Sequence, residues 1–100
     1  MSDEEVEEEI KRIETMEAAK AGIIGLKVRD VANGVIETNN LSHSNVLLKL
    51  IPEELLNKEI TDSNLHNIGI EIKKIRDKQK KYKTKVIKFL TLLSRTIIRL

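Results

Sequence analysis

Residues 68–100 of the chain read IGIEIKKIRDKQKKYKTKVIKFLTLLSRTIIRL. A mainly apolar stripe recurs in this segment at alternating steps of four and three residues: Ile68, Ile72, Ile75, Gln79, Tyr82, Val86, Phe89, Leu93, Thr96 and Leu100. This is the heptad spacing of a helix that lies along another helix. The stripe therefore predicts one long helix over about residues 64–98, with Asp62 or Ser63 as its N-cap.

The composition indicates a helical protein with an aliphatic core. The 100 residues include 14 Ile, 12 Leu and 6 Val, but only 1 Phe, 1 Tyr and no Trp. Charged residues make up 34% of the chain, above the roughly 25% of an average domain. High charge, many aliphatic residues and a heptad period together predict a single helical domain over residues 1–100.

The first third of the sequence predicts a second long helix, over about residues 3–38. Ser2 or Asp3 can serve as its N-cap, and the glutamates that follow complement the positive end of the helix dipole. The residues that form its apolar face are Val6, Ile10, Ile13, Ile24, Val28, Val31 and Val35. Between the two long helices, Pro52 marks the bend in a connector of two short helical pieces. The expected fold is therefore all-α, a helical hairpin or three-helix bundle with coiled-coil packing.

Residues 22–38 also allow a different interpretation. Each of the three glycines in this segment lowers helix propensity by about 1 kcal/mol relative to Ala. Asn33-Gly34, set between apolar residues, is a strong signal for a β-hairpin. On this interpretation the first helix ends before residue 22, and strands occupy residues 23–28 and 35–38.

With that hairpin in place, residues 6–40 resemble the opening helix and first hairpin of the roadblock family of dynein light chains. The resemblance implies an α/β dimer instead of a helical bundle. The residues after 40 do not follow that family's pattern of strands.

The heptad stripe also predicts a partner interface. A hairpin of two long helices leaves a wide apolar face partly uncovered, and burial of such a face is worth about 25 cal/mol per Å². We therefore expect a non-enzymatic scaffold or adaptor subunit, paired with a second copy or with another helical protein. The predicted interface residues are Ile72, Ile75, Gln79, Tyr82, Val86, Phe89 and Leu93. Gln79 either fixes the register of this seam through a hydrogen bond or marks a point where the seam faces water.

Charge is strongly polarised along the chain. Residues 1–20 carry eight acidic and three basic side chains, whereas residues 71–100 carry two acidic and eleven basic ones. Most of the basic residues crowd one run: Lys73, Lys74, Arg76, Lys78, Lys80, Lys81, Lys83, Lys85 and Lys88. This run predicts either a solvated face that complements the acidic N-terminal helix, or a surface for nucleic acid or another anionic partner.

Nothing in the sequence predicts a catalytic, cofactor-binding or metal-binding site. The chain has no cysteine, and His43 and His66 lack partners at metal-ligand spacing. The apolar run over residues 86–100 is too short and too basic to span a bilayer. Because the acidic beginning also lacks the apolar core of a signal peptide, an intracellular location, cytoplasmic or nuclear, is expected.

Overall fold

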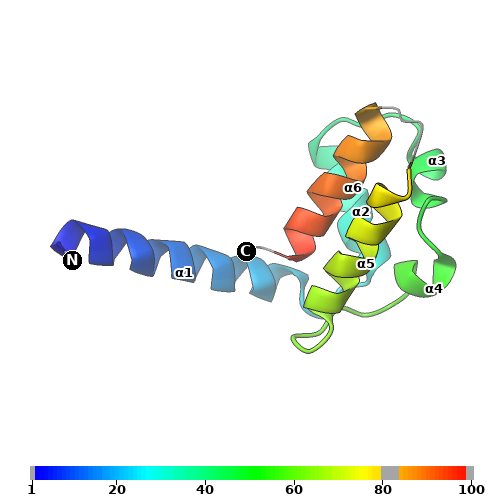
Figure 1. The fold of residues 1–100 in the computed structure, drawn as a ribbon. Coiled ribbons are helices and arrows are strands. Elements are labelled where there is room, and N and C mark those ends of the chain that lie inside the picture. Colours follow the sequence, from blue (N-terminus) through cyan, green and yellow to red (C-terminus); the bar gives the residue numbers. More distant parts are fainter. Residues whose placement is uncertain (1, 80–83, 99–100) are drawn as a thin grey trace.

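The computed structural model describes the backbone of residues 2–79 and 84–98, and the side chains of these residues except 13–21. The described residues contain no strand and form six helices (Figure 1): α1 (Asp3–Ile23), α2 (Val28–Thr38), α3 (Ser44–Leu48), α4 (Glu53–Leu56), α5 (Leu65–Asp77) and α6 (Thr84–Ile97). The all-α prediction is therefore confirmed.

The six helices divide into a body and an arm. Helices α2–α6 surround a common apolar core, whereas α1 leaves this body as a single helix (Figure 1). With 21 residues, α1 is about 32 Å long. The molecule accordingly extends 48 Å along its longest axis, against 27 Å and 23 Å along the other two. Below, α1 is called the arm and α2–α6 the body.

The first predicted long helix, residues 3–38, is interrupted at residues 24–27. Gly25 has φ +90°, a conformation that glycine adopts because it has no Cβ. Its N–H donates to the carbonyl oxygen of Ile60 at 2.8 Å, and the Ile60 N–H donates to the carbonyl oxygen of Leu26 at 2.8 Å. These two hydrogen bonds hold the turn against the loop before α5, so the chain changes direction here instead of continuing the helix.

The hairpin interpretation of residues 22–38 is wrong, because most of this segment is α2. Asn33-Gly34 lies on the exposed side of that helix. The opposite side is buried at helical spacing by Val28, Val31, Ala32, Val35 and Ile36. Burial of these five side chains outweighs the local preference of Asn-Gly for a turn. The α/β fold implied by the roadblock resemblance is likewise not the fold of the described residues.

The connector consists of two short helices, as the sequence predicts. Pro52 directly precedes α4 and separates it from α3. Arg29 of α2 ties this connector to the body, because its Nη2 donates to Glu53 Oε2 at 2.6 Å and to Asn57 Oδ1 at 3.4 Å. The connector also contributes four buried side chains to the core: Leu47, Ile51, Leu55 and Leu56.

The second predicted long helix, residues 64–98, is also interrupted, and its two parts α5 and α6 lie antiparallel. Arg76 Nη1 of α5 donates to Thr91 Oγ1 of α6 at 3.5 Å. In this hairpin the two halves of the stripe bury each other. Five lysines between residues 78 and 85 disfavour a continuous helix through like-charge repulsion.

The N-cap of α5 is Asn64 and not the predicted Asp62 or Ser63. In the turn that leads into α5, Thr61 and Asn64 form reciprocal hydrogen bonds. The Thr61 N–H donates to Asn64 Oδ1 at 2.8 Å, and the Asn64 N–H donates to Thr61 Oγ1 at 3.2 Å. This arrangement satisfies two backbone donors in the turn before the helix.

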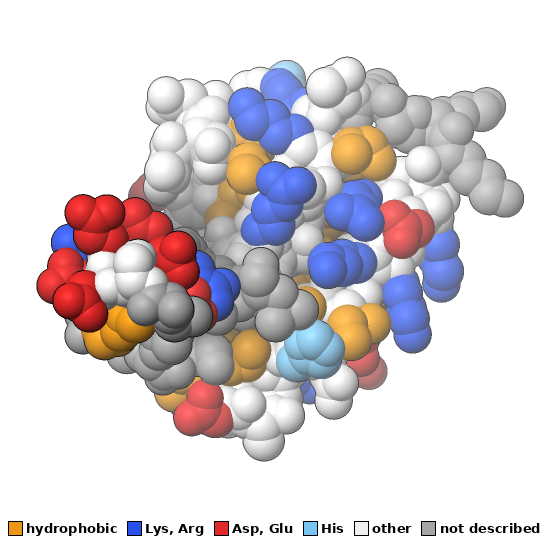
Figure 2. All heavy atoms as spheres, turned by 60° about the vertical axis from the view of Figure 1, so that its left-hand side comes forward, with side chains coloured by type: hydrophobic (Ala, Val, Ile, Leu, Met, Phe, Trp, Pro, Cys, Tyr) orange, Lys and Arg blue, Asp and Glu red, His pale blue; other side chains and the backbone are white. Residues whose placement is uncertain are grey.

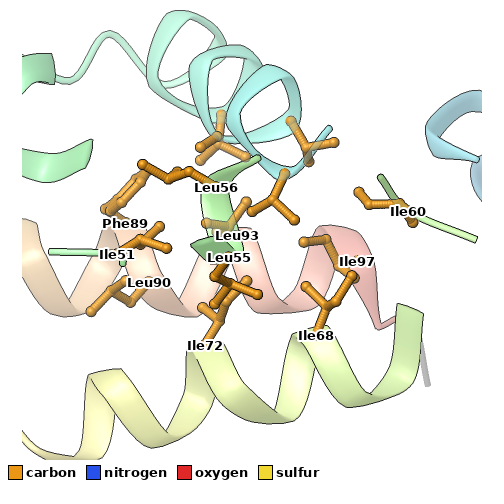
Figure 3. Close-up of a cluster of buried hydrophobic side chains, with 14 of the residues drawn as sticks. Ile51, Leu55, Leu56, Ile60, Ile68, Ile72, Phe89, Leu90, Leu93 and Ile97 are labelled. Carbon is orange, nitrogen blue, oxygen red and sulfur yellow. The ribbon is translucent and has the colours of Figure 1, made fainter. Parts of the chain in front are cut away.

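The core of the body lies between the α5–α6 hairpin, α2 and the connector (Figure 3). Ile68 and Ile72 of α5 point toward Leu93 and Ile97 of α6. On the other side of α6, the core is closed by α2 and the connector. Phe89 is the largest fully buried side chain, and all the others in that class except Ser94 are aliphatic. The predicted aliphatic core is thus formed within one chain.

Two glycines in the body give a direct test of the packing between α5 and α6. An added Cβ at Gly69 would overlap the side chain of Ile98 and lie 3.2 Å from its Cβ, whereas a Cβ at Gly34 meets nothing within 4 Å. Gly69→Ala should therefore lower the free energy of unfolding by about 1–3 kcal/mol. Gly34→Ala should raise it by up to about 1 kcal/mol, because alanine favours the helix. Urea denaturation of the two variants measures both changes, and equal effects at the two positions would contradict this packing.

Candidate functional site

The described half of the arm is acidic and exposed. It begins with an N-cap, because Ser2 Oγ accepts the N–H of Glu5 at 3.2 Å; Ser2 is one of the two predicted caps. Arg12 pairs with Glu9, with Arg12 Nε donating to Glu9 Oε2 at 3.2 Å. The hydrogen bond from Arg12 lowers the pKa of the Glu9 carboxyl. The acidic side chains of this half are Asp3, Glu4, Glu5, Glu7, Glu8 and Glu9.

Two apolar side chains stand among these acids. Val6 is 39% exposed and Ile10 is 49% exposed. They are four residues apart and so lie on one face of the helix. Asp3 and Glu9 are three residues from Val6, and Glu7 is three residues from Ile10, so carboxylates flank this face on both sides. The arm thus presents a short apolar stripe with acidic edges, which its own body does not cover.

The predicted basic surface follows two helices instead of one. Three of its members are exposed: Lys74, Lys78 and Lys88. Three are half-buried: Lys73, Arg76 and Lys85. The rest lie outside the described residues: Lys80, Lys81 and Lys83. Because the chain turns back between α5 and α6, the described members come from the end of α5 and the start of α6, at the same end of the hairpin.

Two members of the basic surface have partners within the chain. Arg76 Nε donates to Asp77 Oδ1 at 3.0 Å, and Lys85 Nζ donates to Ser42 Oγ. Figure 2 shows Lys and Arg side chains spread over the body beside the arm, while acidic side chains gather at the free end of the arm. The acidic and basic halves of the sequence are thus separated in space within one chain.

A groove opens between α4 and α5, next to the basic surface. It has a volume of about 430 Å³. Its apolar residues are Pro52, Leu55 and Ile75. Its charged residues are Lys58, Lys74, Lys78, Glu54 and Glu71, all of them exposed. We call this the α4–α5 groove.

Sequence reasoning singled out Ile75, Lys74 and Lys78 but missed the other groove residues. The groove exists because α4 lies beside α5, and these helices are joined by a loop whose path no local pattern reveals. Pro52 and Leu55 also sit in an ordinary helix-start pattern. No signal in the sequence marks them as surface-forming residues.

The seven predicted interface residues lie mostly inside the body. Three are fully buried in the core: Ile72, Phe89 and Leu93. Two are half-buried and pack against the core: Ile75 and Val86. Gln79 is also half-buried, and its Nε2 donates to the carbonyl oxygen of Ile75 at 3.0 Å; Tyr82 lies outside the described residues. Most of the stripe therefore packs within the chain, and its partly exposed members lie near the end of α5 and the start of α6.

The described side chains show no grouping that suggests metal chemistry. No three His, Asp or Glu side chains among them lie close enough to hold a metal ion. His43 and His66 are both exposed. The surfaces that stand out are the arm, the basic surface and the α4–α5 groove.

Two further findings bear on this chain. Among the residues described, no helix has the length and apolar character needed to cross a membrane. Comparisons with protein-family models, with curated proteins and with solved structures find no match to the chain.

Proposed function

We propose that the chain is a non-enzymatic scaffold or adaptor subunit that acts by packing helices against a partner, either a second copy or another helical protein. The observation that carries this proposal is the arm: a helix of 21 residues that extends from the body and exposes Val6 and Ile10. In a folded protein most of a helix's stability comes from tertiary packing. A partner that covers the apolar stripe would supply the packing that the body does not.

The core of the body supports the same proposal, because it does not include the apolar stripe of the arm, Val6 and Ile10. Among the described side chains of the arm, only Ile23 at its body end packs against the buried cluster. An arm that carries an exposed apolar stripe of its own is suited to helix-in-groove recognition, in which side chains at i and i+4 anchor a helix on a partner.

The mass of the full chain in solution tests the proposal. The chain has a mass of 11.4 kDa. Light scattering on a sizing column should give a dimer at micromolar concentrations, and the dimer should weaken at high salt if opposite charges help to hold it. A monomer at every concentration and salt would reject self-assembly. The basic surface would then become the leading functional surface.

The basic surface favours a second candidate function, binding of nucleic acid or another anionic surface. Lysines on α5 and α6 lie at one end of the hairpin with few acids among them. Lysine contacts phosphate without reading sequence, so such binding would be non-specific.

Titration of a labelled DNA duplex at several salt concentrations tests this second candidate. Non-specific binding should be strong at 50 mM salt and fall steeply by 200 mM salt, as expected when about four to six lysines displace counterions. The absence of binding at the lower salt would reject the candidate.

A further inference from the structure

We infer that the α4–α5 groove is the docking site for the arm of a second copy of this chain. The inference rests on the proposed assembly function and assigns the surface on which assembly takes place. It follows from three features of the described residues: matched apolar surfaces, matched charges, and the direction in which the arm leaves its own body.

The apolar stripe of the arm and the apolar lining of the groove match in chemical character and in size. The groove offers Pro52 and Ile75, and Leu55, which is only 5% exposed, also lines it. The arm offers Val6 and Ile10 one helical turn apart. The groove's volume of about 430 Å³ is enough to take side chains of this size, though not a whole helix. The arm would therefore lie across the groove with these two side chains inserted into it.

The charges beside the apolar surfaces are also complementary. Residues 3–12 of the arm hold six acidic and two basic side chains. The basic pair, Lys11 and Arg12, lies on the side of the helix away from Val6. The groove has three lysines and two glutamates, and none of these five forms an ion pair with another described residue. The acidic edges of the stripe would thus meet lysines whose charges are not already neutralised.

The arm does not lie in the groove of its own chain. In Figure 1 its free end and α4 lie at opposite sides of the molecule. Two arms paired in parallel would also bring six acidic side chains against six, which like-charge repulsion opposes. A groove on another copy can be reached by the arm, and docking there does not bring two acidic arms together.

These features favour a second copy of the chain as the occupant of the groove, because each chain carries both an arm and an α4–α5 groove. Two copies related by a twofold axis would form two identical arm–groove contacts. The area buried would be double that of one contact, which brings a small helical interface closer to the size of stable dimers.

Site-directed crosslinking tests the inference directly, because the chain has no cysteine of its own. Protein carrying Ile10→Cys is mixed with protein carrying Ile75→Cys and oxidised. A disulfide needs Cβ atoms about 3.5–4.5 Å apart, so a heterodimer should form efficiently if the arm lies in the groove. The matched control is Val46→Cys, on α3 at a residue that is 59% exposed, which should crosslink to Ile10→Cys at only a background level.

The outcomes separate this inference from the proposed function. Crosslinking of residue 10 to residue 75 well above the Val46 control supports the inference. If wild-type protein is a dimer but residue 10 links only to residue 10, or links equally to residues 75 and 46, the groove assignment is overturned while assembly stands. If wild-type protein is a monomer at every concentration, the inference and self-assembly both fail.

Charge reversal supplies an independent check. Lys74→Glu combined with Lys78→Glu should weaken dimerisation at least tenfold, because both rim charges would then repel the arm. Adding Asp3→Lys and Glu7→Lys to the arm of that variant should restore most of the loss. Lys49→Glu, an exposed lysine outside the groove, should change the dissociation constant much less. Equal weakening by the groove variant and by Lys49→Glu would overturn the inference.

Discussion

Leu93→Asp should unfold the body rather than merely separate a dimer. Leu93 has no exposed surface and packs in the core from α6. A carboxylate at this position would be buried without a partner, at a cost of several kcal/mol. That is comparable with the whole stability of a small domain, about 5–15 kcal/mol. Far-UV circular dichroism should show a large loss of helix and no cooperative thermal transition.

The matched control for this prediction is Val46→Asp. Val46 is 59% exposed, so a carboxylate there stays in water and should change the melting temperature little. If Leu93→Asp kept its helix content and lost only its ability to dimerise, Leu93 would face a partner, as the heptad stripe first suggests. The core described for a single chain would then be incorrect.

Phe89→Ala should lower the free energy of unfolding by about 3–5 kcal/mol. Phe89 is the largest of the fully buried side chains, and its removal combines lost apolar burial with a cavity that α2, α6 and the connector fill only in part. Guanidinium denaturation should show the change as a lower midpoint with an unchanged slope.

Val86→Ala is the control for that loss. Val86 lies one turn earlier on α6 and is half-buried, so its truncation removes fewer atoms from a site that water already reaches. We expect its effect to be less than half that of Phe89→Ala. Equal effects would mean that residue 89 is not in a closed core.

The sequence was sufficient to predict the fold class, one helix cap and the connector. These features could be predicted because helical spacing, aliphatic composition and the Ser2 cap depend only on residues that are close together in the sequence. The interruption at Gly25 was harder to predict, because a glycine in a helix and a glycine with positive φ look alike in sequence. The decisive contact is with Ile60, 35 residues away along the chain.

The stripe over residues 68–100 shows a second limit of sequence reasoning. A heptad repeat predicts that a helix faces another helix, but not whether that partner is another chain or the other half of the same segment. Here Ile68 and Ile72 meet Leu93 and Ile97, so the segment is largely its own partner. The predicted interface consequently became core, and the candidate surface moved to the arm and to a groove formed by non-local packing.

The structure shows where the acidic and basic ends of the sequence lie in space. The six acidic side chains of residues 3–9 gather at the free end of the arm, whereas the described members of the basic surface lie on the body (Figure 2). Since the arm extends away from its own body, its acids and the groove lysines stay apart within one chain (Figure 1). Attraction between them is therefore available to an assembly of two chains, and it should be weakened by salt.

Hydrogen exchange of the arm at several protein concentrations tests the central claim most directly. If the arm is held by a partner, amides of residues 6–12, whose N–H groups bond within the helix, should exchange slowly in concentrated protein and rapidly on dilution. Core amides of α2 and α6 should be protected at every concentration, because their stability comes from the body. Exchange of the arm at one rate across the whole concentration range would contradict the account, since the arm would then have no partner of its own kind.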